Sequence, residues 1–565
     1  MKKILLALPL LAILSACEPT PEQTQVSYKS KAQAPASDVT LVYNATIHTV
    51  DAATPNAQSF AYENGKIIAI DNAQNLLESY PDANKIDLGG ATVIPGLIDA
   101  HGHLLGLGES LGNANLMGST SKADIIERLQ QHAASLPEDQ WLLGRGWDQN
   151  DWPVKELPTA ADLDAAFPNR PVWLERVDGH ANWANSKAMQ VALKDLNGDW
   201  QPDGGEIVRI DKQANGVFID NAVKLIQSQV PVASEAQVVA ALQRAMDKTA
   251  SVGLTAMHDA GTSLDTWKKL QKLRDQNELG IRVYAMADGA NEMLSYLCNN
   301  GTHVDPNAML TARSIKLYSD GALGSRGAAL LADYSDAPGN VGLLIESEAT
   351  LKQHAKRAAG CGLQVNIHAI GDRGNRVTLN VLEQASLSNN PGRHRIEHSQ
   401  VVEKSDFQRF KDLQLIASVQ PTHATSDMYW AEERVGSERI KGAYAWQKFN
   451  DLGIPLALGS DFPVEQPDPL HGFYAAVSRQ DSKGWPEAGW YNSEALTREQ
   501  ALHGFTLGAA FAAFQEDSLG SISVGKYADF VVLSKDIMQI PHKEILNTKI
   551  LATYINGALV YSGNK

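Results

Sequence analysis

The feature that most constrains the fold is a series of short apolar runs that alternate with helix-like segments through the middle of the chain. Helical periodicity marks the segments 350–359, 376–385, 404–412 and 444–452. Strands that alternate with helices build a parallel sheet, and eight of them is the number that a (β/α)8 barrel needs. We therefore predict an α/β fold with a TIM-like barrel. The predicted strands are 92–100, 253–259, 281–287, 312–318, 363–368, 394–398, 416–420 and 454–459.

The two ends of the chain carry a different pattern, with short strands joined by tight turns. Near the N-terminus, the segments 39–49 and 59–70 are predicted to be such strands, and Glu63-Asn64-Gly65-Lys66 is typical of a hairpin turn. Near the C-terminus, 525–533 is predicted to be a turn followed by a strand. The segments 550–554 and 558–561 form a further predicted hairpin around Asn556-Gly557. We predict one composite β-sandwich made from residues 38–92 and 518–565, beside a barrel domain at 93–517.

The interval of about 105–250, between the first and second predicted strands, is far too long for a loop. It is rich in tryptophan, and we predict an inserted subdomain. Because it leaves the carboxyl end of the first strand, we expect it to roof the active site. The tryptophans suggest an apolar or aromatic group in the substrate, although tryptophans more often simply pack.

The first residues are typical of a targeting signal. A basic start, Met1-Lys2-Lys3, precedes an apolar run at 4–14 that is too short to span a bilayer but suits a signal-peptide core. Leu14-Ser15-Ala16-Cys17 resembles a bacterial lipobox, so we predict a lipoprotein signal peptide at 1–16, lipidation of Cys17 and a flexible tether at 17–37. An ordinary secretory signal is the alternative. Glu18 after the cysteine favours an outer-membrane lipoprotein that faces the periplasm.

Charge and cysteine content argue against three classes of protein. The chain has 49 Lys plus Arg against 65 Asp plus Glu, a net charge of -16. Such an acidic chain is a poor nucleic-acid binder, because phosphate contacts demand basic surface. Three cysteines exclude a disulfide framework and a cysteine-built zinc module. Cys298 and Cys361 could pair or remain buried thiols. We expect a small-molecule substrate, and a homo-oligomer is possible.

Residues that suit metal binding stand where several predicted strands end. His101-Gly102-His103 follows the first strand, and in an extended chain residues i and i+2 share a face. Alone, a His-x-His pair is weak evidence. His368, His398 and Asp461 end later strands, and Lys316 lies in an apolar run where an unpaired lysine is costly to bury. Carboxyl ends of barrel strands converge on one mouth, so these side chains are expected to meet there.

With these residues in this order, the chain resembles the amidohydrolase superfamily, and more closely its YtcJ-like branch, over residues 38–562. The resemblance implies a metal-bearing TIM-like barrel with a composite β-sandwich. It also implies hydrolysis of amide or related C–N bonds other than peptide bonds. The segments that carry it are Pro95-Gly96-Leu97-Ile98-Asp99-Ala100-His101-Gly102-His103, Asp320-Gly321-Ala322-Leu323-Gly324-Ser325-Arg326, His368-Ala369-Ile370-Gly371-Asp372, Glu397-His398-Ser399, Gly459-Ser460-Asp461 and Gly525-Lys526-Tyr527-Ala528-Asp529.

The resemblance also implies a ligand set for one or two divalent ions, with zinc expected. The family's ligands fall on two groups, His101, His103 and Asp461 for one metal, and His368 and His398 for a second. Lys316 matches a lysine that is carboxylated in binuclear members and bridges both metals. The alternative is an unmodified Lys316, ion-paired with Asp461 or Asp320, and a single metal.

Further roles attach to residues around this set. Asp461 is the expected general base, with a purely structural ligand as the alternative. His180, in Asp178-Gly179-His180, is either a donor to the developing oxyanion or a structural histidine. His423, Arg326 and Asp320 are candidates for substrate binding, although a structural loop clamp competes with that role for Arg326 and Asp320.

The sequence thus predicts a metal-dependent amidohydrolase at the cell envelope, acting through metal-activated water. An esterase, lactonase or carbamate hydrolase on the same site is the second possibility. A catalytically silent binding lipoprotein is the third, although all six expected ligand positions are filled.

Overall fold

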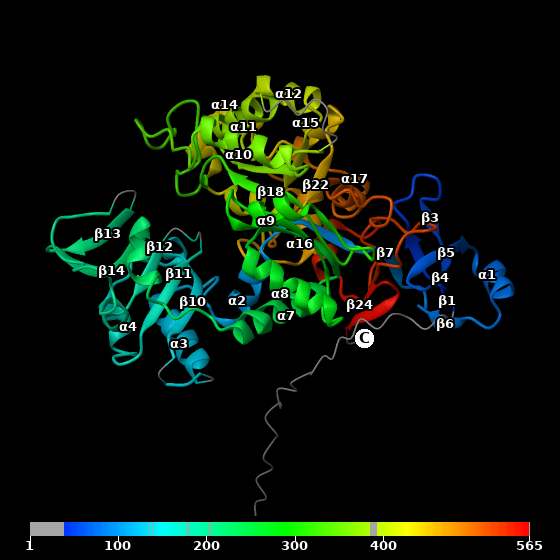
Figure 1. Cartoon of the computed structure of the whole chain (residues 1–565), viewed down its shortest axis with the longest axis horizontal. Coiled ribbons are helices and arrows are strands. Elements are labelled where there is room, and N and C mark those ends of the chain that lie inside the picture. Colours follow the sequence, from blue (N-terminus) through cyan, green and yellow to red (C-terminus); the bar gives the residue numbers. More distant parts are fainter. Residues whose placement is uncertain are drawn as a thin grey trace, which may run out of the picture.

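The centre of the molecule is a ring of parallel strands (Figure 1) in the order β8–β15–β16–β18–β19–β20–β21–β22. The computed structural model describes residues 39–563 apart from 135, 139, 178, 180, 203–204 and 385–391. The ring nearly closes where the Asp461 N–H donates to the His101 carbonyl at 2.7 Å. This confirms the predicted TIM-like barrel. Its strands are β8 (Leu97–Gly102), β15 (Leu254–Thr262), β16 (Arg282–Asp288), β18 (Leu310–Tyr318), β19 (Gln364–Ala369), β20 (Arg395–His398), β21 (Ile416–Val419) and β22 (Leu456–Leu458).

Helices cover the outside of the ring. In one of them, α10 (Glu348–Gly360), Leu351, Ala355 and Ala358 recur at helical spacing and are buried against the barrel. The Ser347 hydroxyl caps its first turn by accepting from the Thr350 N–H at 3.1 Å. Further helices of the barrel domain are α8 (Leu264–Asp275), α9 (Glu292–Asn300), α11 (Asp372–Gln384), α12 (Phe407–Asp412), α13 (Pro421–Asp427), α14 (Ala431–Arg439), α15 (Trp446–Asp451), α16 (Pro469–Ser478), α17 (Arg498–Gly504) and α18 (Leu507–Ala512).

The predicted first strand, 92–100, is in fact two strands that serve different sheets. β7 (Thr92–Pro95) pairs with strands of the sandwich, and β8 pairs with β15 in the barrel. The break falls at Gly96, where a Cβ would lie only 2.2 Å from the Thr255 hydroxyl oxygen. Glycine therefore permits the close approach to β15 at the point where the chain leaves one sheet for the other.

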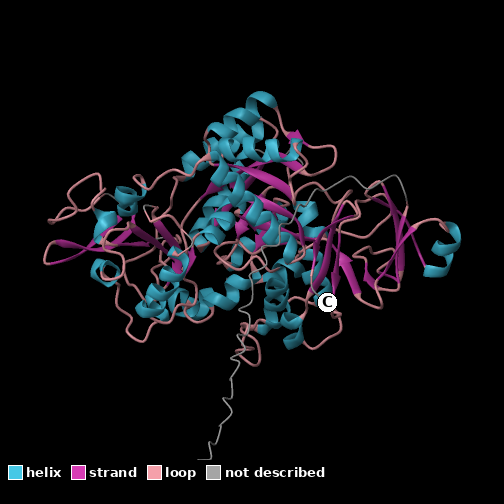
Figure 2. Cartoon of the chain, turned by 90° about the horizontal axis from the view of Figure 1, so that it is seen from below, coloured by secondary structure: helices cyan, strands magenta, loops and turns pink. Residues whose placement is uncertain are grey.

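Both ends of the chain build the sandwich, which packs beside the barrel (Figures 1 and 2). Its two sheets have the orders β5–β4–β1–β6 and β25–β24–β23–β7–β2–β3. Phe60, Phe530 and Val532 lie buried between them. The composite sandwich is thus present, and its exact domain boundaries stay predictions. The strands other than β7 are β1 (Thr40–Tyr43), β2 (Thr46–His48), β3 (Asn56–Ala57), β4 (Ser59–Glu63), β5 (Lys66–Asp71), β6 (Asn84–Asp87), β23 (Phe530–Leu533), β24 (Ile550–Ile555) and β25 (Ala558–Ser562), with α1 (Ala73–Ser79) at the edge.

The insertion forms a sheet of its own, in the order β13–β14–β12–β11–β10–β9, beyond α2 (Leu104–Gly112) and α7 (Glu235–Ser251). Trp147, Trp152 and Trp183 share one buried core there, so these tryptophans pack. Among the described residues no helix has the length and apolar character to cross a membrane. The elements are β9 (Ala114–Asn115), β10 (Leu142–Trp147), β11 (Val172–Arg176), β12 (Ala181–Ala184), β13 (Gly205–Ile210), β14 (Gln213–Asp220), α3 (Lys122–Ala133), α4 (Ala160–Asp164), α5 (Ser186–Met189) and α6 (Lys224–Gln227).

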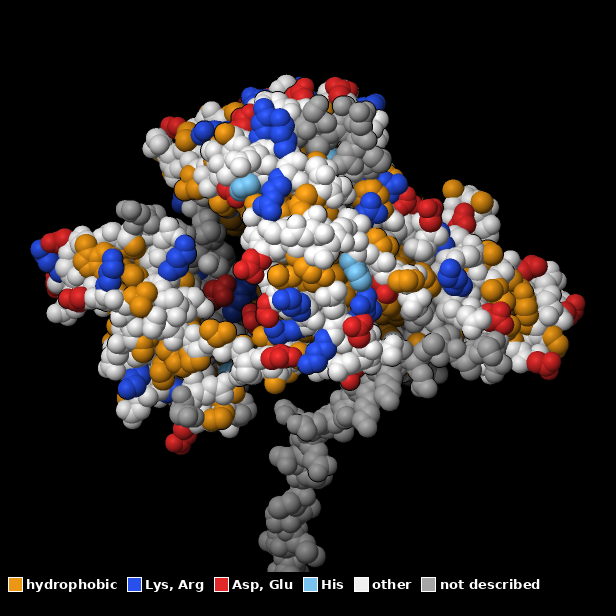
Figure 3. Space-filling model, in the orientation of Figure 1, with side chains coloured by type: hydrophobic (Ala, Val, Ile, Leu, Met, Phe, Trp, Pro, Cys, Tyr) orange, Lys and Arg blue, Asp and Glu red, His pale blue; other side chains and the backbone are white. Residues whose placement is uncertain are grey.

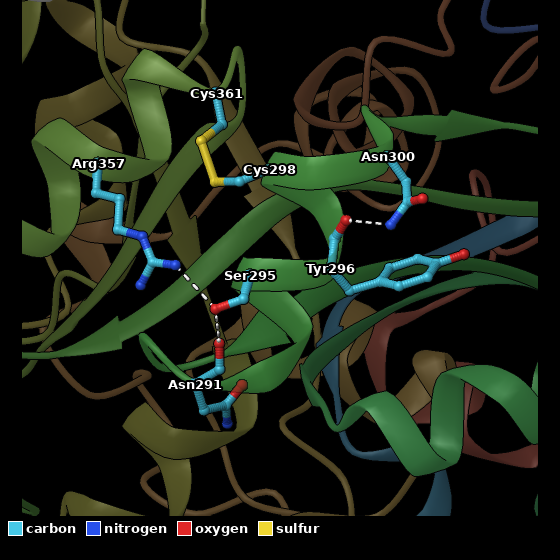
Figure 4. The surroundings of a disulfide bond; sticks show 7 residues. All are labelled: Asn291, Ser295, Tyr296, Cys298, Asn300, Arg357 and Cys361. Atoms are coloured by element: carbon cyan, nitrogen blue, oxygen red, sulfur yellow. Dashed lines mark hydrogen bonds between the residues drawn. A yellow bond between two sulfur atoms is a disulfide. The ribbon is translucent and has the colours of Figure 1, made fainter.

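A disulfide joins two neighbouring barrel helices. Cys298 of α9 is bonded to Cys361, which caps the C-terminus of α10 (Figure 4). The Arg357 guanidinium of α10 also donates to the Ser295 hydroxyl of α9 at 2.8 Å. The pairing that the sequence left open is therefore present in the structure.

Candidate metal centre

Two histidines and an aspartate meet where the barrel closes. His101 and His103 lie at the carboxyl end of β8, and Asp461 follows β22. His103 Nε2 lies 3.0 Å and His101 Nε2 3.6 Å from Asp461 Oδ1. A Cβ at Gly102 would lie 2.7 Å from the Phe462 ring, so glycine allows both imidazoles to reach one carboxylate.

The carboxyl ends of two further strands add two more imidazoles. His368 is the penultimate residue of β19 and His398 is the last residue of β20, and their ring centres are 4.5 Å apart. The ring of His398 also lies 4.7 Å from that of His101. His101, His398 and Asp461 offer ligand atoms that all lie within 4.8 Å of one another, which is a set that could hold a metal ion.

Lys316 of β18 reaches the same cluster from the adjacent strand. It is buried, and its Nζ lies 3.1 Å from His101 Nε2. Burial lowers the pKa of this lysine, although the nearby carboxylates of Glu397 and Asp461 oppose the shift. Within the described part of the chain, Lys316 forms no ion pair with Asp461 or Asp320 inside 4 Å.

The imidazoles of His101, His368 and His398 are held in the neutral form that binds metal. Burial, assisted by the charge of Lys316, lowers the pKa of His101 to about 4 and that of His368 to about 3. For Asp461, burial and the polar neighbours shift the pKa in opposite directions. Burial raises its pKa, but the hydrogen bond from His103 and the neighbouring imidazoles together hold the pKa well below its usual value. The cluster thus combines neutral imidazoles with a carboxylate.

A buried nitrogen atom without a hydrogen-bond partner supports the binding of a cation at the cluster. His368 Nε2 is buried and has no hydrogen-bond partner among the described residues. Its nearest carboxylate oxygen, Asp320 Oδ1, is 3.8 Å away. A buried polar atom without a partner calls for an ion or an ordered water. Imidazole and carboxylate donors fit zinc and related divalent ions.

His423 is the further candidate that lies at the cluster. It sits in the first turn of α13, stacks on His398 at 6.0 Å, and places Nε2 3.8 Å from Asp461 Oδ2. This position is compatible with the predicted contact to substrate. His180 and Cys17, predicted for catalysis and lipidation, lie outside the described residues. Their roles, like that of His423, stay predictions.

Arg326 and Asp320 make contacts within the protein. The Arg326 guanidinium pairs with Asp336 at 2.7 Å. The Asp320 carboxylate is fully buried and accepts hydrogen bonds from the backbone N–H groups of Ala329, Ile370 and Gly371, between 2.8 and 3.0 Å. Burial raises its pKa to about 7. These are the contacts expected of the loop-clamp alternative, and a contact of either residue with substrate stays a prediction.

Two residues beside the cluster were not singled out from the sequence. Glu397 Oε2 lies 2.5 Å from His101 Nδ1, and Gln420 Oε1 lies 2.8 Å from His398 Nδ1. Successive strand residues normally face opposite sides, so Glu397 and His398 were not expected to serve one site. His398 has a φ of 71°, which turns its ring out of the strand pattern. The available signal was the position of Glu397 next to a predicted ligand.

The insertion borders this mouth. The Arg145 guanidinium of β10 donates to the carbonyl of Pro463 at 2.8 Å, two residues beyond Asp461. It also pairs with Glu175 of β11 at 3.3 Å. Figure 3 shows a hollow between the insertion and the rest of the molecule, with acidic and basic side chains at its base.

Comparison with known proteins places the chain in a family. The family model described as "Amidohydrolase family" matches residues 85–561, which include every residue of the cluster. The chain belongs to the amidohydrolase family. The resemblance read from the sequence motifs is thereby confirmed, and the class of enzyme is a hydrolase.

Individual relatives of this amidohydrolase cover nearly its whole length. It is 34% identical to the putative amidohydrolase YtcJ of Bacillus subtilis, over 88% of this chain and 95% of that protein. It is 26% identical to the N-substituted formamide deformylase of Arthrobacter pascens, over 92% and 98% of the two chains. The crystal structure of an uncharacterized metal-dependent hydrolase from Pyrococcus horikoshii superimposes with a TM-score of 0.75 at 28% identity, over 89% and 99%.

Proposed function

We propose that this amidohydrolase is a metal-dependent enzyme that hydrolyses a C–N bond, other than a peptide bond, in a small molecule. The observation that carries the proposal is the convergence of His101, His398 and Asp461, whose ligand atoms lie within 4.8 Å of one another at the barrel mouth. A metal-dependent hydrolase among the solved relatives supports it. The name of the formamide deformylase supports an amide-type substrate.

The residues fit a pair of zinc ions. His101, His103 and Asp461 would hold one ion, and His368 and His398 a second. When bound, such ions lower the pKa of a water molecule and polarise the substrate carbonyl. Lys316 would bridge them as a carbamate, which forms when its neutral amine adds to carbon dioxide and releases one proton. Its lowered pKa favours the neutral amine that this addition requires.

Asp461 would move the proton during hydrolysis. Its Oδ1 faces the imidazoles, and its Oδ2 lies toward His423, 3.8 Å from Nε2. Its lowered pKa keeps the carboxylate ionised, and in this role it would take a proton from water and pass it to the departing amine nitrogen. In this proposal His423 binds the substrate, and His180 donates a hydrogen bond to the developing oxyanion.

A substrate panel tests the C–N assignment. N-formyl and N-acyl amines should be hydrolysed by zinc-loaded protein, and treatment with a chelator should remove that activity. The matched esters and lactones test the second function, since the same site would attack any suitable carbonyl. Turnover of esters alone would reject the amide proposal, and no turnover by metal-loaded protein would favour the binding lipoprotein.

We further propose that the enzyme is a lipoprotein anchored through Cys17 on the outer membrane, facing the periplasm. The disulfide between Cys298 and Cys361 supports an oxidising compartment, because such bonds are rare in reducing cytosol. Expression in bacteria with radiolabelled palmitate should label the parent protein and not Cys17→Ala. Equal labelling of both would reject the anchor.

A further inference from the structure

A charged pair lies buried inside the barrel beneath the cluster. Arg395 and Glu397 occupy alternate positions of β20, so both side chains face the barrel interior. Both are fully buried, and Arg395 Nε lies 2.8 Å from Glu397 Oε1. The guanidinium also donates to the Ala100 carbonyl at 2.6 Å and contacts His258 Nδ1 at 2.9 Å. These contacts fix the guanidinium from three sides.

The carboxylate of this pair meets His101 on the side of the ring away from the cluster. His101 Nε2 faces Lys316 and Asp461, at 3.1 and 3.6 Å, while Nδ1 lies 2.5 Å from Glu397 Oε2. Glu397 forms a buried ion pair with Arg395, and an ionised carboxylate can only accept hydrogen bonds. Nδ1 must therefore carry the proton, and Nε2 presents its lone pair toward Lys316 and the cluster.

We propose that Glu397 is a positioning residue that fixes the tautomer and the ring orientation of His101, and that Arg395 holds Glu397 in place for this task. The proposal rests on the metal centre proposed above. A carboxylate behind a metal-binding histidine raises the basicity of the ring, and loss of such a partner typically weakens metal binding by about 10- to 100-fold.

His398 offers an internal contrast. Its Nδ1 contacts a neutral amide, with Gln420 Oε1 at 2.8 Å. The two imidazoles thus have partners of the same geometry and different charge. Only a carboxylate increases ring basicity strongly, so the ion at His101 should be held more tightly than the ion at His398.

The competing explanation is that Glu397 only neutralises the buried Arg395. Removing one partner of a buried ion pair is strongly destabilising, whereas replacing both by apolar groups is often neutral. The stability of single variants therefore cannot separate the two roles. The double variant Arg395→Met/Glu397→Leu can, because it leaves no buried charge unpaired and still removes the acceptor behind His101.

The experiment measures zinc affinity of the full protein by competition with a chelating dye, alongside thermal unfolding of the metal-free forms. Arg395→Met/Glu397→Leu should unfold near the parent temperature and bind zinc about 10- to 100-fold more weakly. Arg395→Met/Glu397→Gln, which restores a neutral acceptor, should recover part of that loss. Parent-like zinc affinity in the Leu double variant would overturn the proposal.

A second comparison tests the proposal even if Arg395→Met/Glu397→Leu does not fold. Arg395→Met keeps the carboxylate, so it should bind zinc about tenfold more tightly than Arg395→Met/Glu397→Gln, which has the amide. Equal affinities would overturn the proposal. The absorption spectrum of cobalt-substituted protein should shift between these two variants, because the donor strength of His101 changes. A parent that binds no zinc at all would instead reject the proposed metal centre.

Discussion

At the scale of single residues, Asp461 has the geometry for two tasks. One carboxylate oxygen lies near His101 and His103, and the other lies toward His423. Its φ of 63° places it in the left-handed region, which for a residue other than glycine occurs mainly where the surrounding structure holds it. The hydrogen bond from its N–H to the His101 carbonyl supplies part of that constraint.

Asp461→Asn separates these tasks. The amide keeps an oxygen that can bind a metal but cannot accept a proton at neutral pH, so kcat should fall by about 10²- to 10⁴-fold. Zinc content, measured on the same samples, should persist in part. Unchanged kcat with normal zinc content would show that Asp461 is only a ligand. Asp517→Asn, at an exposed position, is the control and should leave kcat unchanged.

The lowered histidine pKa values predict how metal binding responds to acid. His101, His368 and His398 stay neutral below the ordinary histidine pKa of about 6.5, because burial depresses their pKa values. Protons therefore compete with metal at these rings only well below pH 6.5. Two histidines of ordinary pKa on one ion, as proposed for His368 and His398, would lose about 10²-fold in affinity between pH 7.5 and 5.5, and we expect about tenfold or less.

Zinc titration at these two pH values, corrected for protonation of the competing chelator, measures the difference. A loss near hundredfold would mean that the imidazoles titrate like exposed groups. It would contradict the burial on which the proposed neutral ligand set depends.

Sequence patterns located the polar residues of the cluster but not all of their partners. His101, His368, His398, Lys316 and Asp461 were found because each follows or lies in an apolar strand. The partners behind the rings depend on backbone angles and on contacts between distant strands. Gln420 contacts His398 across 22 residues, and Glu397 contacts His101 across 296. No local periodicity carries that information.

At the scale of elements, strand ends place the chemistry and helices hold the strands. The eight strands were predictable because each is a compact apolar run. The division of the first predicted strand at Gly96 was not, because both halves are equally apolar. The division depends instead on the approach of Gly96 to Thr255. The disulfide could not be predicted either, because the sequence does not reveal that α9 and α10 are neighbours.

Removing the disulfide should loosen α9 from α10. Cys298→Ser/Cys361→Ser should lower the free energy of unfolding by about 2–4 kcal/mol, because the bond closes a loop across a separation of 63 residues in the unfolded chain. Denaturant unfolding under oxidising conditions measures the change. Each single serine variant loses the same bond and should match the double variant. Single variants as stable as the parent would contradict a structural role.

At the scale of the whole molecule, a buried ion pair joins the barrel to the C-terminal segment. Arg282 of β16 makes two contacts with the Asp529 carboxylate, at 2.6 and 2.9 Å, and both side chains are buried. The same guanidinium donates to the Asn556 side chain at 2.5 Å. The sequence suggested that the two chain ends build one sandwich, but it did not reveal this link, because Arg282 and Asp529 are 247 residues apart.

Asp529→Ala should therefore destabilise the protein strongly. It leaves the Arg282 charge buried without its carboxylate partner, which typically costs about 3–5 kcal/mol. Urea unfolding followed by circular dichroism measures the effect, and Arg282→Met/Asp529→Ala should recover part of the loss. A single variant as stable as the parent would show that Arg282 is solvated or paired elsewhere.

The central claim is that side chains from separate barrel strands meet around a divalent cation at one mouth. Crystals of zinc-loaded protein, measured above and below the zinc absorption edge, test it most directly. The account predicts an anomalous peak about 2.0–2.2 Å from Nε2 of His101 and from an Asp461 oxygen. A second peak near His368 and His398 would support the binuclear form. Zinc bound at full occupancy only elsewhere would contradict the account.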